Sequence, residues 1–448
     1  MNGPSVTSTR QFIIYAPPEF PNLDVPAQRA LHHYRARTAS AIAYPFGYEL
    51  WSTIAIQMSE KHDFVMSALI ALSSMHELYF QPPDVRSSLQ QDGIRHYNKA
   101  IRDIVHLNQV ERSTDAILIS CIAFCALESL RGSWPRALQH ALSGMKIIAE
   151  QRQSSSQESS IPAQILDEAF LALQNQVMEL GGRDESRVYR PFNGHEPDLP
   201  LRFDTVEEAL HHLQVIYNCT AYLLDCHRLE QGCGDIYLGG LSMDLEQQHA
   251  LIKARLEQWG SAMENLRSSG NENPHSKQRQ ACLLLDMYYV GFQTEFDDSA
   301  EDSIHKFTTM LDLAETFLKC QAQGTEVGSC TYSVSLGVIP VLFMLATQDI
   351  ICLREKSLSL LRLHKRREGP WDSGVAARLA ERVIATKTEM VMSRNEQCSV
   401  SVLEINFVDD TTCQITYIIK VQQTDAQVIT WPATASENCR TYIQIIDI

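Results

Sequence analysis

The sequence lacks several features that would indicate a function directly. Its first cysteine is Cys121, so residues 1–120 offer no thiolate to a zinc site, which needs thiolate or imidazole ligands at fixed spacing. No two cysteines have C-x-x-C spacing, and the G-x-S-x-G, H-E-x-x-H, Walker and G-x-G-x-x-G motifs are missing. These absences weaken an enzymatic interpretation and exclude DNA recognition through an amino-terminal cysteine cluster.

Positive charge and long apolar runs are also scarce. Asp and Glu number 54 against 38 Lys and Arg, and the formal charge of -16 opposes binding to a phosphate backbone. The longest apolar stretch, Ala116–Leu127, is interrupted by Ser120 and is shorter than the roughly 18–20 residues that span a bilayer. Residues 1–20 contain one basic residue and a short apolar run, Phe12–Tyr15, which does not indicate a signal peptide. We expect a nuclear or cytoplasmic protein without direct contact to nucleic acid or membrane.

Helical patterns fill most of the chain, whose 448 residues with 44% hydrophobic content are ample for a large packed core. From His62, apolar residues recur every three or four positions until Pro82-Pro83, which predicts an amphipathic helix. Three more helices follow before residue 150. Among these, Ile117–Leu130 is apolar on nearly all sides and is expected to lie centrally. Further helices are predicted at Ala163–Leu180, Thr205–His227, Leu245–Ser268, Lys277–Phe296, Ser303–Cys320, Ser335–Thr347, Ile351–Leu363 and Gly374–Ser393.

The pattern changes its period after Asn395. Apolar and polar residues then alternate up to Val421 around a turn at Asp409-Asp410-Thr411, which predicts a β-hairpin, with a third strand near Gln427–Trp431. The predicted fold is mainly α: a multi-helix orthogonal or bundle-like domain with a small C-terminal β-hairpin or three-stranded sheet. We divide the chain into an N-terminal arm at 1–45 with a helical segment near Ala27–Ser40, a helical domain at 46–395 with a mobile loop at about 151–162, and a β-rich tail at 396–448.

Three side chains are candidates for acid or base chemistry: His76, Glu128 and His140. Each lies near an apolar face of a predicted helix and could serve as a general acid or base if a cavity opened between the helices. Glu128, on the most buried helix, needs a partner such as Arg102, Arg131 or a histidine. It is then either a structural salt bridge, which we favour, or a tuned acid.

Two constellations resemble metal sites but have simpler explanations. The D-D-x-x-E spacing from Asp297 to Glu301 lacks a second ligand set and suits a solvated loop before a helix. His212, Cys219 and Cys226 recur every seven residues, about 10 Å apart along a helix, which is too far for one ion without further ligands. We therefore expect no metal and no cofactor, and we expect the thiols to be reduced and buried in the core.

Several short segments occur in an order and at a spacing typical of one protein family. They are Tyr48-Glu49-Leu50-Trp51, Ser67–His76, His96–Ile101, Phe124–Glu128, His140–Gly144 and Arg366–Ser373. Together they resemble the regulatory region of fungal zinc binuclear-cluster transcription factors, the fungal-specific transcription factor domain, over most of residues 28–395. Members of that family carry a cluster of six cysteines near the amino terminus, and residues 1–120 depart from this pattern because they contain none.

The resemblance implies a regulator of transcription without its own DNA-binding domain. Such a protein would act through a protein partner, either a DNA-binding factor or a co-regulator, or through a small-molecule effector, in control of a fungal secondary-metabolite pathway; a homodimer is an open alternative. A second hypothesis is a biosynthetic enzyme on the same helical scaffold, which would bind a metabolite in a central cavity and promote a cyclisation or isomerisation by positioning and acid–base groups.

Two observations would separate these hypotheses. A cavity on which His or Glu side chains converge favours a ligand or a reaction, whereas a filled core with exposed apolar patches favours a protein partner. A third hypothesis is a truncated gene product whose missing exon encodes the zinc cluster, which the genomic sequence upstream of Met1 would reveal.

Overall fold

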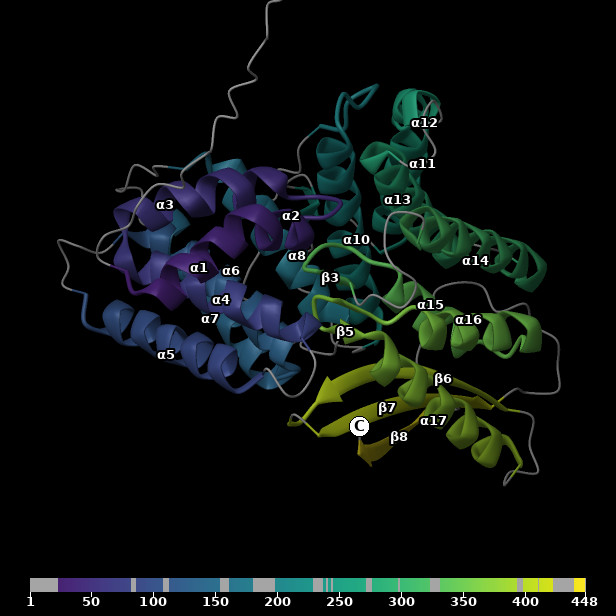
Figure 1. Cartoon of the computed structure of the whole chain (residues 1–448). Helices are drawn as coiled ribbons and strands as arrows, with labels where there is room; N and C mark the ends of the chain where they lie inside the picture. Colours follow the sequence, from purple (N-terminus) through teal and green to yellow (C-terminus); the bar gives the residue numbers. More distant parts are fainter. Residues whose placement is uncertain are drawn as a thin grey trace, which may run out of the picture.

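A computed structural model provides the structure of this chain (Figure 1). It describes residues 23–81, 86–107, 113–153, 161–179, 198–228, 237–238, 241–242, 245–270, 276–296, 299–322, 331–392, 398–409, 411–421 and 439–447. Within these ranges, none of the helices has the length and apolar character that a membrane crossing requires. The proposed domain boundaries at residues 45 and 395 stay predictions.

The N-terminal part of the molecule is a group of packed helices. Their bounds are α1 Val25–His33, the π-helical turns η1 Tyr34–Thr38 and η2 Leu50–Ile54, α2 Ala39–Ile42, α3 Ala55–Lys61, α4 Asp63–Phe80, α5 Arg86–Val105, α6 Thr114–Arg131 and α7 Trp134–Gln153. The side chains of α6 from Asp115 to Leu130 are all buried, as its apolar sequence predicts. Ser113 caps the start of α6 by accepting a hydrogen bond from the Ala116 N–H, and Gly132 ends it with a φ of 77°. The four helices predicted between residues 62 and 150 are confirmed.

The chain continues from residue 163 with helices that lie beside this group (Figure 1). Their bounds are α8 Ala163–Glu179, α10 Val206–Arg228, α11 Leu245–Ala262, α12 Glu264–Gly270, α13 Lys277–Gln293, η4 Thr294–Phe296, α14 Ala300–Ala322, α15 Ile339–Ala346, α16 Ile351–Leu363 and α17 Ser373–Met392, with a short hairpin of β1 Tyr237–Leu238 and β2 Leu241–Ser242. Two predictions are corrected. The helix expected at 245–268 is divided into α11 and α12, and the helix expected from Ser335 begins only at Ile339.

A small three-stranded sheet joins distant parts of the chain. Strands β3 Thr331–Ser333 and β4 Arg366–Glu368 pair in parallel, and β4 pairs with β5 Trp371–Asp372 in an antiparallel hairpin. Gly369 turns the hairpin with a φ of 51°, a conformation that glycine adopts without strain. Residues 366–372, part of the family-like segment Arg366–Ser373, therefore form a hairpin whose charged side chains contact several helices.

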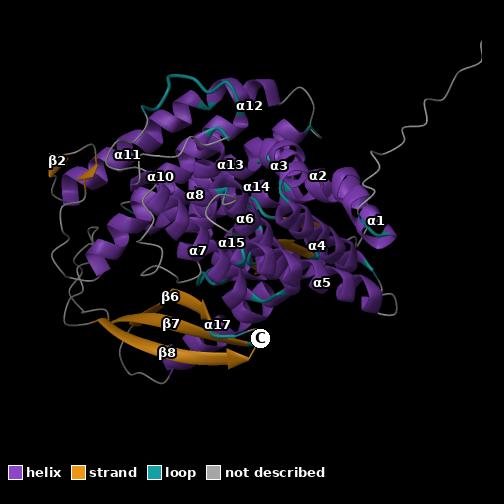
Figure 2. Ribbon diagram, turned by 90° about the vertical axis from the view of Figure 1, so that its left-hand side faces the viewer, coloured by secondary structure: helices purple, strands orange, loops and turns teal. Residues whose placement is uncertain are grey.

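The C-terminal sheet contains β6 Cys398–Phe407, β7 Thr412–Val421 and β8 Cys439–Asp447, all antiparallel in the order β6-β7-β8. The predicted hairpin is β6–β7, and its turn is held by the Asp409 carboxylate, which accepts a hydrogen bond from the Thr411 N–H. The third strand expected near residues 427–431 lies outside the described residues, and β8 supplies the third strand instead. Figure 2 shows this sheet at the edge of the molecule, covered on one face by α17. The predicted mainly α fold with a small C-terminal sheet is confirmed.

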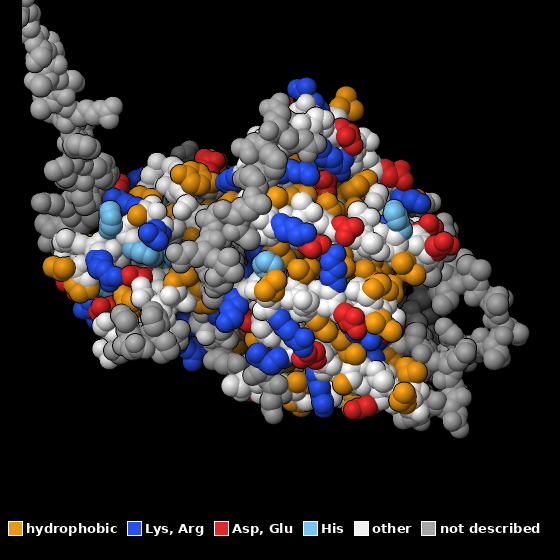
Figure 3. All heavy atoms as spheres, turned by 45° about the vertical axis from the view of Figure 1, so that its right-hand side comes forward, with side chains coloured by type: hydrophobic (Ala, Val, Ile, Leu, Met, Phe, Trp, Pro, Cys, Tyr) orange, Lys and Arg blue, Asp and Glu red, His pale blue; other side chains and the backbone are white. Residues whose placement is uncertain are grey.

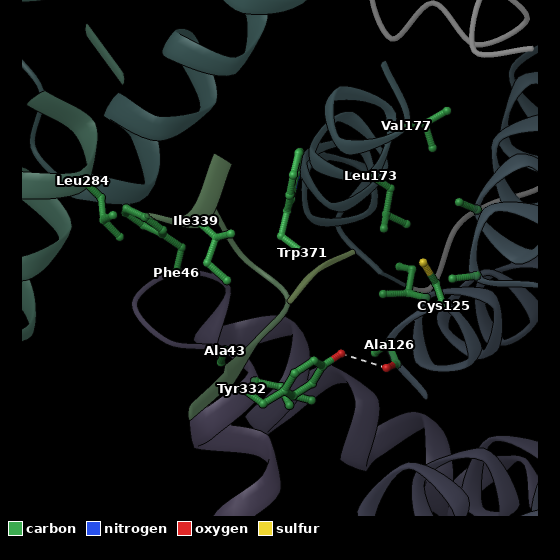
Figure 4. Close-up of a cluster of buried hydrophobic side chains, with 14 of the residues drawn as sticks. Ala43, Phe46, Cys125, Ala126, Leu173, Val177, Leu284, Tyr332, Ile339 and Trp371 are labelled. Atoms are coloured by element: carbon green, nitrogen blue, oxygen red, sulfur yellow. Dashed lines mark hydrogen bonds between the residues drawn. The ribbon is translucent and has the colours of Figure 1, made fainter. Parts of the chain in front are cut away.

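A continuous hydrophobic core connects the helices to the small sheet. Figure 4 shows its centre, where Tyr332 of β3 donates a hydrogen bond of 2.7 Å to the Ala126 carbonyl of α6. Trp371 of β5 and Leu173 of α8 are buried in the same cluster. The small sheet thus contacts α6 and shares a core cluster with α8, two helices that border the cavity described next.

Candidate functional site

His76, the first acid–base candidate, lies on α4 in a closed environment. Its Nδ1 shares a hydrogen bond of 3.1 Å with the Thr38 hydroxyl, and its ring contacts Phe80 edge-on. Only 3% of His76 is exposed, and this burial lowers the pKa of its imidazole to about 3. The ring is therefore neutral at neutral pH.

Glu128 and His140, the other two candidates, lie on either side of Tyr97. The Tyr97 hydroxyl and His140 Nε2 are 2.7 Å apart, and burial lowers the pKa of His140 to about 4. Burial, reinforced by the charge of Glu128, raises the pKa of the Tyr97 hydroxyl. Both Glu128 carboxylate oxygens accept hydrogen bonds from Arg131, at 2.9 and 3.0 Å, so Arg131 is the salt-bridge partner that the sequence analysis requires. The structure brings Glu128 and His140 together and places His76 elsewhere.

The two metal-like constellations gain no further ligands in the described part of the chain. His212 is buried and Cys219 half-buried on α10, while the side chain of Cys226 lies outside the described residues, as do Asp297 and Asp298. Among the described residues, no three His, Cys, Asp or Glu side chains converge in a way that could hold a metal ion.

One concavity, which we call the central cavity, lies between helices α6, α8 and α10. It has a volume of about 610 Å³, and residues of Phe46–Trp51 and Val334–Leu336 also line it, together with Gly369. Helical spacing produces its walls, because residues four apart on α8 share one face, as do residues four apart on α10. The side chains on these faces include Ile165, Ala169, Ala172, Leu173, Gln176, Leu210 and Gln214.

A smaller pocket of about 30 Å³, which we call the inner pocket, continues the central cavity toward the small sheet. The two share Ala172, Gln176, Leu210, Gln214, Ser335 and Leu336. The inner pocket is aromatic at its far end, where Tyr217, Tyr288, Phe292 and Trp371 line it. The Gln176 side-chain amide donates a hydrogen bond of 2.9 Å to the Val334 carbonyl, which fixes the loop that lines both spaces.

The carboxylates on the lining of the central cavity are those of Glu49, Glu168, Glu207 and Glu208, and no Lys or Arg lies among its described lining residues. His211 also lines the cavity. Burial raises the pKa of Glu168, and the charges of Glu207 and Glu49 raise it further, whereas a hydrogen bond from the Gln164 amide opposes the shift. Burial lowers the pKa of His211 to about 4, so this histidine adds no positive charge at neutral pH. The cavity is thus an apolar space with an electronegative rim.

A second concavity, the basic groove, has a volume of about 830 Å³ and lies where α6 meets α16, α17 and the small sheet. Its lining includes Arg131, Arg362, Lys365, Arg366, Arg367 and Arg378, with the acids Asp372 and Glu381. Four of these cations form ion pairs: Arg131 with Glu128, Arg362 with Glu381, Arg366 with Glu368 and Arg367 with Asp372. On the face turned forward in Figure 3, Lys and Arg side chains are interspersed with Asp and Glu. Most of the basic side chains of the groove are therefore engaged in ion pairs within the fold.

The cavity residues Glu168 and Gln214 were not singled out by the sequence analysis. His211 directly precedes His212, the histidine of the seven-residue spacing considered above. One signal was available: Glu168 and Gln176 on α8, and Gln214 on α10, are polar residues on otherwise apolar helix faces. That signal does not show that the two faces meet across an open space.

Comparison with known proteins finds a family match over the N-terminal helices. Residues 29–174 match the fungal specific transcription factor domain, from α1 to most of α8. The chain is also 24% identical over 475 aligned residues, covering 84% of this chain and 75% of the relative, to the Aspercryptin biosynthesis cluster-specific transcription regulator of Emericella nidulans. No solved structure matches. The resemblance inferred from the short segments is confirmed.

Proposed function

We propose, from the fungal-specific transcription factor domain at residues 29–174, that this protein regulates transcription in a fungal secondary-metabolite pathway. The match to that domain is the observation that carries the proposal. A relative that is by name a biosynthesis cluster-specific transcription regulator supports the assignment to secondary metabolism. In this role the protein acts in the nucleus.

The protein contacts DNA through a partner and responds to a small molecule. Residues 1–120 contain no cysteine for a zinc cluster, and the charge of -16 opposes contact with phosphates, so a DNA-binding protein or a co-regulator makes the link. The central cavity, bordered by α6 and α8, is the place for an effector, since its apolar walls and few polar groups are typical of small-molecule sites.

Deletion of the gene tests the regulatory role. We expect the transcripts of neighbouring biosynthetic genes to fall together, and the wild-type gene to restore them. Both RNA and metabolites are measured in the same cultures. If the transcripts stayed normal while one intermediate accumulated and its product vanished, the regulator would be refuted and the enzyme hypothesis supported.

A further inference from the structure

The central cavity, of about 610 Å³, adjoins the inner pocket through six shared lining residues, and the inner pocket, at about 30 Å³, has the size of roughly one water molecule. The far end of the inner pocket is aromatic, and the apolar walls of the combined space include Ala172, Leu173, Leu210 and Leu336. Sites of this kind bury most of a small ligand's apolar surface and fix its orientation through a few polar groups. The polar groups of this space therefore indicate which ligand it suits.

Gln214 is the polar group at the middle of this space. It lines both the central cavity and the inner pocket, and only 7% of the residue is exposed. In the described part of the chain, its backbone carbonyl accepts a hydrogen bond from Asn175, but its side-chain amide has no hydrogen-bond partner. The atoms of this amide are not among the fully buried polar atoms that lack a partner, so the amide borders the open space of the cavity, where water or a ligand satisfies it. The position of this amide indicates a ligand with a hydrogen-bonding group in its middle.

Glu168 marks the other end of the space. Glu49 and Glu207 lie on the same rim, and their negative charges raise the pKa of Glu168, as its burial does. None of the ion pairs between described residues involves these three carboxylates. Lys277, a cation near the rim, lies over the Tyr48 ring, 5.3 Å from its centroid. A bound cation would remove the repulsion at this rim, whereas a bound anion would increase it.

We propose that the central cavity binds a lipophilic amine: a molecule with an apolar body, an amide or hydroxyl group opposite Gln214, and a protonated amine at Glu168. The inference rests on the proposed function, since it names the chemical class of the effector. Binding then depends on the sign of the ligand's charge as well as on its apolar area.

Two matched probes test the charge requirement on the full chain. N-Octanoylethylenediamine carries an apolar tail, an amide and a protonated amine, whereas N-octanoylglycine carries a carboxylate in place of the amine. Binding of each is measured by isothermal titration calorimetry at pH 7. We expect the amine to bind at least about tenfold more tightly than the carboxylate, the ratio that one favourable charge interaction of about 1.4 kcal/mol produces.

Three variants localise the binding. Glu168→Gln is expected to remove most of the preference for the amine, whereas Glu389→Gln, the same change on the exposed surface of α17, leaves it intact. Gln214→Leu is expected to weaken both probes about five- to tenfold, since it removes the hydrogen bond in the middle of the ligand. In the absence of probe, Gln214→Leu should melt at the same temperature as the wild type or higher, because it deletes an amide without a partner.

The outcomes separate this inference from the proposed function. Absence of saturable binding, equal affinity for the two probes, or an unchanged preference in Glu168→Gln would overturn the lipophilic-amine site. If the transcript measurements confirm the regulator but neither probe binds, the proposed function stands and the lipophilic-amine effector is refuted. If the amine binds tightly and selectively but deletion of the gene leaves the transcripts normal, the lipophilic-amine site stands and the regulatory function is refuted.

Discussion

Glu368 of β4 contacts the start of α15, which lies 29 residues earlier in the sequence. It is 3% exposed, its carboxylate accepts a hydrogen bond of 2.7 Å from the Ile339 N–H at the start of α15, and it forms an ion pair with the buried Arg366. Gly337 makes room for this carboxylate, since a Cβ at that position would lie 2.0 Å from a Glu368 oxygen. A single carboxylate thus caps α15 and neutralises a buried guanidinium.

Glu368→Ala is expected to lower the free energy of unfolding by about 3–5 kcal/mol, because it leaves the buried charge of Arg366 unpaired. The matched control is Glu381→Ala. Glu381 also pairs with an arginine, Arg362, but both side chains are largely exposed, so we expect a loss below about 1 kcal/mol. Urea unfolding measures both variants. Similar losses in the two would show that burial does not set the strength of the Glu368 pair.

At the residue scale, the sequence predicts the salt-bridge partner of a side chain better than it predicts which residues line a cavity. Glu128 was predicted to need a partner such as Arg102, Arg131 or a histidine, and Arg131 is that partner because it lies one helical turn away, at i+3. Gln214 was not predicted to be important, since its environment depends on α8, which lies tens of residues away in sequence. Local patterns carry information on neighbours within one helix, and the space between two helices depends on packing that no local pattern records.

At the element scale, the C-terminal sheet packs on α17 through one of its faces. Ile415 and Tyr417 of β7 are fully buried on that face. Gln444 of β8 accepts hydrogen bonds from the Thr386 hydroxyl of α17, at 2.9 Å, and from the Tyr417 hydroxyl, at 3.0 Å. On β8, Ile443 and Ile445 are exposed. Because successive side chains point to opposite faces of the sheet, one face packs on α17 and the other is the exposed outer face.

Ile415→Ala is expected to destabilise the protein by about 2–5 kcal/mol, because it removes buried methyl groups between β7 and its neighbours and leaves a cavity. Ile445→Ala makes the same chemical change on the outer face, where 67% of the residue is exposed, and we expect less than about 1 kcal/mol. Thermal unfolding followed by circular dichroism compares the two. A large loss in Ile445→Ala would contradict the assignment of the faces.

Helices and strands that depend on interactions between residues close in sequence were predicted more accurately than those that depend on distant residues. Helices such as α4 and α16 depend on local apolar spacing and on nearby helix ends, and they were predicted within one residue. Strand β3 has three residues and pairs with β4 more than thirty residues later, so no local alternation predicts it. The start of α15 was also missed, since Glu368 caps it from a distant strand.

At the scale of the whole molecule, several histidines are held neutral inside the fold. Burial lowers the pKa of His76 to about 3 and those of His140, His211 and His212 to about 4. Their unfolded-state pKa is about 6.5, so below that pH the unfolded chain takes up protons that the folded chain does not. The stability from these histidines is present above pH 6.5 and is lost as the pH falls toward 4. Glu168, whose pKa is raised, acts in the opposite direction in the acidic range.

We expect the free energy of unfolding to fall steeply between pH 7 and pH 5, with His76 alone contributing about 2 kcal/mol to that loss. His76→Gln should reduce the loss by that amount, since glutamine keeps a hydrogen-bonding group near Thr38 and has no proton to gain. His305→Gln, at an exposed position of α14, serves as the control and should leave the pH dependence unchanged. Urea unfolding at pH 7, 6 and 5 measures all three proteins. A stability that stayed constant over this range would show that the buried histidines take up protons without unfolding, because water or a nearby carboxylate then stabilises their charged form.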